Sequence, residues 1–124
     1  MIQHITEEEI TKYGLGIAGY SDKRQQTVLT TTIKRFRGSF GPLPKTAADL
    51  FVEVQAEDLG EKRIIKPNVH YLLMALMWLN TYRTSEDMGG LFKLNVKTVD
   101  IKIWMYVDAI QALKDKKVSS IFNK

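Results

Sequence analysis

Apolar residues recur at intervals of three and four positions along most of the chain, which is the spacing of amphipathic helices rather than of strands. One such segment, from Thr46 to about Glu57, has its apolar residues on a single face. A second, from Asn68 to Tyr82, is apolar on nearly every face, so we expect a central helix that other helices surround. The one-faced pattern of the first segment consists of Ala47, Leu50, Phe51 and Val54.

Capping residues and helix breakers place the elements at the N-terminal end. Thr6 and Glu9 have the spacing of a capping box, which predicts the start of a helix. This helix is expected to run to about Tyr13 and to be ended by Gly14. The next helix is expected to end before Gly38, where glycine and proline break the pattern.

The predicted elements together give an all-α fold. We expect one compact domain over residues 1–124, built from about five to six helices. An alternative in which residues 1–25 form an N-terminal arm stays open. Besides the segments named above, helices are expected over residues 25–37, 85–92 and 95–114, with a loose tail after them.

The composition is that of a folded domain, with 44% hydrophobic and 26% charged residues. The absence of cysteine excludes disulfides, a thiolate zinc site and a cysteine nucleophile. The longest apolar run, Tyr71–Leu79, is far shorter than the roughly 18 residues that span a bilayer, and Met1–Ile10 has no apolar signal core. We therefore expect a soluble intracellular protein with no membrane partner.

The net charge of +4 is distributed unevenly. Up to Ile65 the basic and acidic residues balance, so the whole basic excess lies between Lys66 and Lys124. Such an excess is compatible with a polyanionic partner, but an ordinary solvated basic surface is the more common explanation. The charge alone therefore does not decide the function.

The segment from about 84 to 113 has the residue pattern of a helix-turn-helix, two helices that cross through a short turn. Gly89 supplies the small residue required where the helices meet, while Thr84 and Asn95 can cap the first and the second helix. The apolar residues expected inside the angle are Met88, Phe92, Leu94 and Val99.

Two positions depart from this helix-turn-helix pattern. Lys93 occupies a turn position that usually carries glycine. Lys102 stands three residues after Val99, where an apolar residue is expected, and Ile103 can take over that inward role after a small rotation.

A series of landmarks occurs in order between about Arg35 and Val118. They are Arg35–Gly41 (RFRGSFG), Leu50-Phe51, Leu73–Tyr82 (LMALMWLNTY), Phe92, Lys97–Val99, Trp104, Tyr106-Val107 and Ile110–Leu113. In order and spacing they resemble the N-terminal region of Harbinger-type DDE transposases and of transposase-derived proteins of microbial eukaryotes. The resemblance implies a helical DNA-binding segment, a nuclear location, and a separate RNase H-like nuclease domain that has no counterpart in these 124 residues.

We therefore predict a DNA-binding helix-turn-helix module whose partner is double-stranded DNA. The second helix would enter the major groove with its first turns against the base edges. The residues expected to read bases are Lys97, Thr98, Ile101 and Lys102, which would project away from the seam of Val99 and Ile103. The residues expected to hold phosphates are Lys93 and Arg83, with Arg35 and Arg37 as a second backbone contact.

We expect neither catalysis nor a cofactor nor a metal site. A DDE nuclease needs three carboxylates that converge on two metal ions, whereas the acids here fall at helix starts or on predicted outer faces. His4 and His70 are isolated from each other. The GxGxxG-like stretch Gly14–Gly19 follows no buried strand, so it does not indicate a dinucleotide site.

An alternative function is a transposase-derived protein–protein interaction or scaffold module within a larger assembly, including a homo-oligomer. Asp100 and Ile101 favour it, because the resembling proteins tend to carry basic or aromatic residues there. Ile101 and Met105, with Ile121 and Phe122 of the tail, would form the docking surface. Trp78 and Trp104 are expected in the core.

Overall fold

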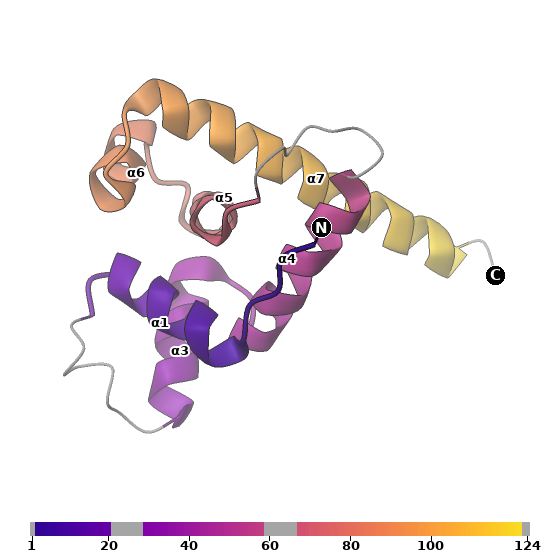
Figure 1. The fold of residues 1–124 in the computed structure, drawn as a ribbon, viewed down its shortest axis with the longest axis horizontal. Helices are drawn as coiled ribbons and strands as arrows, with labels where there is room; N and C mark the ends of the chain where they lie inside the picture. The colour runs from indigo at the N-terminus through magenta and orange to yellow at the C-terminus, as the bar shows by residue number, and fades with distance from the viewer. Residues whose placement is uncertain (1, 21–28, 59–66, 123–124) are drawn as a thin grey trace.

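The computed structural model describes residues 2–20, 29–58 and 67–122, with side chains as far as Ala56 in the second range and Leu113 in the third. These residues form six α-helices and no strand (Figure 1), which confirms the predicted all-α fold. The helices are α1 (Glu7–Ile17), α3 (Leu29–Phe40), α4 (Pro44–Asp58), α5 (Val69–Thr81), α6 (Ser85–Phe92) and α7 (Val96–Phe122).

Helix α1 begins with the predicted capping box. The Thr6 hydroxyl accepts the Glu9 N–H at 3.1 Å, and the Glu9 carboxylate accepts the Thr6 N–H at 3.4 Å. Ile10 and Leu15 on this helix are buried in the core, so an N-terminal arm is wrong for Glu7–Ile17. Positions 21–25 of that alternative lie outside the described residues.

The prediction that Gly14 ends α1 is wrong, because the helix continues to Ile17. A Cβ atom on Gly14 would lie 2.5 Å from Cε2 of Phe36 and 2.8 Å from Cε2 of Phe40. The glycine is therefore required by the close approach of two aromatic rings of α3 and not by a turn.

The boundaries of α3 and α4 also differ from the prediction. Helix α3 passes through Gly38 and ends at Phe40, just before Gly41, whose φ of 98° only glycine adopts readily. Residues 25–28 of the predicted helix lie outside the described residues. Helix α4 begins at Pro44, whose missing N–H costs nothing in a first turn, and so starts earlier than the predicted segment that begins at Thr46.

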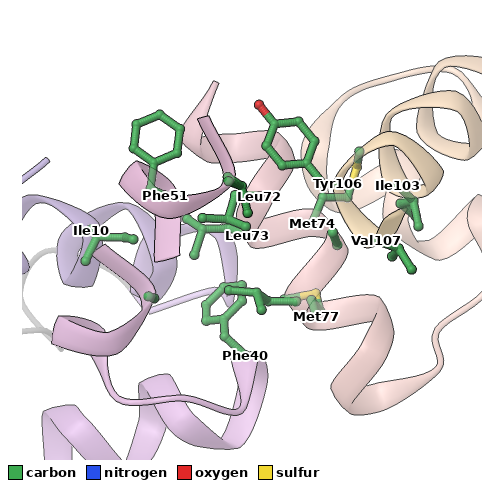
Figure 2. Close-up of a cluster of buried hydrophobic side chains, with 14 of the residues drawn as sticks. Ile10, Phe40, Phe51, Leu72, Leu73, Met74, Met77, Ile103, Tyr106 and Val107 are labelled. Atoms are coloured by element: carbon green, nitrogen blue, oxygen red, sulfur yellow. The ribbon is translucent and has the colours of Figure 1, made fainter. Parts of the chain in front are cut away.

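Helix α5 is the centre of the domain, as predicted. Leu72–Met77, six consecutive residues, are all buried, so no face of this stretch is exposed. The helix contacts α1, α3, α6 and α7. Figure 2 shows side chains of several helices converging on it, among them Ile10, Phe40 and Tyr106.

A buried hydroxyl joins the middle of α7 to the start of α5. Tyr106 is 1% exposed, and its hydroxyl accepts the N–H of Asn68, the N-cap residue of α5, at 2.9 Å. The Asn68 side chain in turn accepts the His70 N–H at 2.8 Å. Helix α7 extends to Phe122 and so includes most of the segment predicted to be a loose tail.

Candidate nucleic-acid interface

Helices α6 and α7 are joined by the short turn Lys93–Asn95 and pack against each other. Both predicted caps are present. The Thr84 hydroxyl accepts the Asp87 N–H at 3.1 Å, and the Asn95 side-chain oxygen accepts the Thr98 N–H at 2.8 Å. The local sequence therefore determines where each of the two helices starts.

Gly89 is the point of closest approach between α6 and the segment that leads into α7. A Cβ atom there would lie 2.7 Å from the carbonyl oxygen of Leu94 and 3.9 Å from Cγ2 of Val99. Met88 and Val99 are fully buried, whereas Phe92 and Leu94 are half-buried. The predicted need for a small residue at this position is confirmed.

Lys93 ends α6 in the left-handed conformation, with φ 57° and ψ 45°. Its N–H and that of Leu94 both donate to the Gly89 carbonyl, which closes the helix end. A residue with a Cβ atom is strained here by about 1–2 kcal/mol, which is why this turn position usually carries glycine. The lysine side chain itself is exposed.

Lys93→Gly is therefore expected to raise the free energy of unfolding by about 0.5–1 kcal/mol, the relieved strain less the backbone entropy of glycine. Urea unfolding checks this value. Lys93→Ala, which loses the charge but keeps the Cβ atom, serves as the control and should show no such gain. A gain of equal size in both variants would attribute the effect to the charge and not to the backbone.

The side chain of Lys102 does not point where the sequence predicted. It is half-buried, and its ammonium lies 5.3 Å from the centroid of the Tyr71 ring on α5, a cation–π contact. The expectation that Lys102 projects outward as a base reader is therefore wrong. Ile103 is 2% exposed and occupies the inward position that the helix-turn-helix pattern assigns to residue 102.

The outer face of α7 combines charged and apolar side chains. Ile101 is 54% exposed and Trp104 is 55% exposed, so the prediction that Trp104 belongs to the core is wrong. The Trp104 ring rests against half-buried Trp78 of α5, with centroids 5.4 Å apart. Thr98 is half-buried. The exposed residues between positions 97 and 111 are Lys97, Asp100, Ile101, Trp104, Asp108 and Gln111.

The predicted phosphate-binding residues fall into two groups. Arg83, between α5 and α6, and Lys93, in the turn before α7, are both exposed. Arg35 and Arg37 lie on α3, and in Figure 1 α5 lies between α3 and α7. The Arg35 guanidinium lies 4.6 Å from the centroid of the Tyr20 ring, and the Arg37 Nε donates to the Gly41 carbonyl at 3.4 Å. Neither of these two contacts involves a residue of α6 or α7.

Asp100 is an acidic residue that stands in the sequence among the residues expected to read bases, between Thr98 and Ile101. Its carboxylate accepts a hydrogen bond from the hydroxyl of Ser85, the first residue of α6. The charge is thereby held beside the N-terminus of α6, where the helix dipole favours an anion. Sequence spacing could not reveal this contact, because it joins two different helices.

Across residues 2–20, 29–58 and 67–122 there is no group of three His, Asp or Glu side chains that could hold a metal ion. In the same ranges no helix has the length and apolarity needed to cross a membrane. Comparison with known proteins gives no match to a family model, to a curated protein or to a solved structure.

Proposed function

We propose that the chain is a DNA-binding module in which α6 and α7 act as a helix-turn-helix, as the resemblance to Harbinger-type transposases implies, with a nuclear location and no catalysis of its own. One observation carries the proposal. Helix α6 packs closely on the start of α7 at Gly89, while the outer face of the first turns of α7 stays exposed. A recognition helix needs both this support and this exposure.

Three exposed cations in and beside the α6–turn–α7 segment would supply the phosphate contacts. They are Arg83 before α6, Lys93 in the turn and Lys97 in the first turn of α7. The first turn of α7 contains no acidic residue, so the positive end of the helix dipole is available to a phosphate. Such contacts fix the position of the protein on the duplex without reading its sequence.

Base contacts would come from the residues that follow along the same face. Lys97 can donate to the guanine acceptors in the major groove, and the apolar Ile101 side chain can contact a thymine methyl group. The Thr98 hydroxyl can bond a base or a phosphate, since the cap by Asn95 uses only its backbone N–H. Lys102, held over Tyr71, is not part of this proposal.

The test is fluorescence anisotropy of the full chain on random duplex DNA across a salt series. Each neutralised phosphate contributes about −0.9 to the slope of log K against log salt, so the double variant Arg83→Ala/Lys97→Ala should flatten the slope by about two units. The matched control Lys12→Ala/Lys45→Ala removes the same charge from exposed positions on α1 and α4 and should leave the slope nearly unchanged. Equal slopes for the wild type and the first variant would contradict the assigned face.

A second candidate function, a protein-interaction module, is favoured by the exposure of Ile101 and Trp104 on α7. Large apolar side chains that lie together on a surface mark contact sites. The surface differs from the predicted one, because Met105 is half-buried against the core and the side chains of Ile121 and Phe122 lie outside the described residues. Absence of DNA binding even at low salt would favour this candidate.

A further inference from the structure

Four exposed residues of α7 form a stripe along the helix. Lys97, Ile101, Trp104 and Asp108 follow one another at intervals of four, three and four positions. These intervals average about 3.7, close to the 3.6 residues of one helical turn, so the four side chains lie in line along one side of the helix. Figure 1 shows α7 running along one edge of the domain. We call these four residues the α7 stripe.

The order of residues in the α7 stripe is symmetric about its midpoint, which lies between Lys102 and Ile103. Lys97 and Asp108 lie at equal distances along the sequence on either side of this midpoint. Ile101 and Trp104 also lie at equal distances on either side of it. In two antiparallel helices related by a twofold axis, each residue meets its counterpart at the same distance beyond the midpoint. The basic end of one α7 stripe would thus face the acidic end of the other, and the apolar residues of the two stripes would face each other.

We propose that this surface binds a second copy of the chain, with the two α7 helices antiparallel. Lys97 of each copy faces Asp108 of the other, and Ile101 of each copy packs on Trp104 of the other. Each contact occurs twice because the interface is isologous. Within the described residues neither Lys97 nor Asp108 forms an ion pair of its own, so both charges are free to pair across the axis.

The centre of the α7 stripe contains an aromatic side chain that other aromatic rings hold in place. The Trp104 ring is braced by Trp78, which also meets the Tyr82 ring edge-on with centroids 6.4 Å apart. Tyr82 is 77% exposed and extends the apolar area beyond α7. Aromatic side chains dominate the centres of interfaces, while charged pairs at the rim set orientation. An interface of one helix pair is small, so we expect a weak, transient dimer.

Pairing and DNA binding use the same side of α7. Lys97 and Ile101 belong to both surfaces, so one α7 cannot hold DNA and a second copy at the same time. Asp108 belongs only to the pairing surface. The inference therefore stands apart from the proposed function, and a variant at Asp108 separates the two.

Sedimentation equilibrium of the full chain, over micromolar to submillimolar concentrations, tests the proposal. The wild type should dimerise, and Lys97→Glu or Asp108→Lys alone should each weaken the dimer about tenfold, because each places two like-charged pairs across the axis. The combination Lys97→Glu/Asp108→Lys should restore it. Lys12→Glu, at an exposed position of α1, makes the same charge change away from the stripe and should have no effect.

A wild type that stays monomeric, a double variant that fails to recover, or an equal loss with Lys12→Glu would overturn the proposal. Trp104→Ala should also leave a monomer, and a full dimer in that variant would count against the stripe. Anisotropy on duplex DNA separates this inference from the proposed function. Asp108→Lys should weaken pairing about tenfold and keep DNA binding, whereas a wild type that pairs but binds no DNA would overturn the proposed function alone.

Discussion

Replacing Phe36 with alanine should lower the free energy of unfolding by about 3–5 kcal/mol. The side chain is completely buried, and its ring packs on that of Phe40 with centroids 4.9 Å apart. The ring also closely approaches Gly14 of α1, where an added Cβ atom would lie 2.5 Å from its Cε2, so the cavity left by alanine would lie between α1 and α3. Small domains are stable by only about 5–15 kcal/mol, so the urea midpoint should fall steeply.

Leu29→Ala is the matched control on the same helix. Leu29 is 71% exposed, so its loss should change stability by about 0.5 kcal/mol or less. An equal loss in both variants would attribute the effect to α3 as a whole and not to the buried ring.

A double-mutant cycle identifies the contact itself. Gly14→Ala should destabilise the wild type by about 1–3 kcal/mol, because the new Cβ atom meets two rings of the core. In the Phe36→Ala background the same change should cost less, since only the Phe40 ring remains. An identical cost in both backgrounds would show that the close approach of Phe36 to Gly14 is not the reason.

Gly89→Ala and Gly90→Ala should change stability in opposite directions although the residues are adjacent. A Cβ atom on Gly89 meets the Leu94 carbonyl oxygen at 2.7 Å, and a backbone atom cannot rotate away, so we expect a loss of about 1–3 kcal/mol. A Cβ atom on Gly90 meets nothing within 4 Å, so the better helix propensity of alanine should add about 0.5–1 kcal/mol. Urea unfolding of both variants measures the two signs.

The same pair of variants bears on the proposed function. Gly89→Ala must displace the turn that sets α7 against α6, so the affinity for duplex DNA at fixed salt should fall at least tenfold. Gly90→Ala should bind as the wild type does. Wild-type stability and wild-type affinity in Gly89→Ala would contradict the role assigned to this contact.

The elements predicted best from the sequence are those whose signals are local. The bounds of α6 and the caps by Thr84 and Asn95 depend on residues within three positions of one another, and all were predicted correctly. Helix α5 was placed well because apolar residues on every face have one physical explanation, burial on all sides. Gly14 and Gly38 were wrongly predicted to end helices, and both lie inside one. A glycine within a helix can be required by close packing, as at Gly14, or tolerated at an exposed position, as at Gly38.

The candidate site was predicted less well because it depends on which side of α7 faces α5. The apolar spacing correctly placed Ile103 on the inner side, but the adjacent Trp104 was also expected in the core and is 55% exposed. Lys102 makes a cation–π contact with Tyr71 of α5. The sequence does not show that these two residues of different helices are neighbours. DNA contact by the exposed cations Arg83, Lys93 and Lys97 stays a prediction, and Arg35 and Arg37 lie on a separate helix, α3.

The hydrogen bond between the Asn68 amide and the Tyr106 hydroxyl makes hydrogen exchange of this amide sensitive to the contact between α5 and α7. Amides at the start of a helix have no acceptor within that helix and ordinarily exchange their hydrogen with solvent quickly. The Asn68 amide instead donates to a hydroxyl on a buried ring of α7. In the folded domain this hydrogen should exchange with solvent after the bond to Tyr106 opens, so its exchange rate sets an upper limit on how often α7 parts from the start of α5.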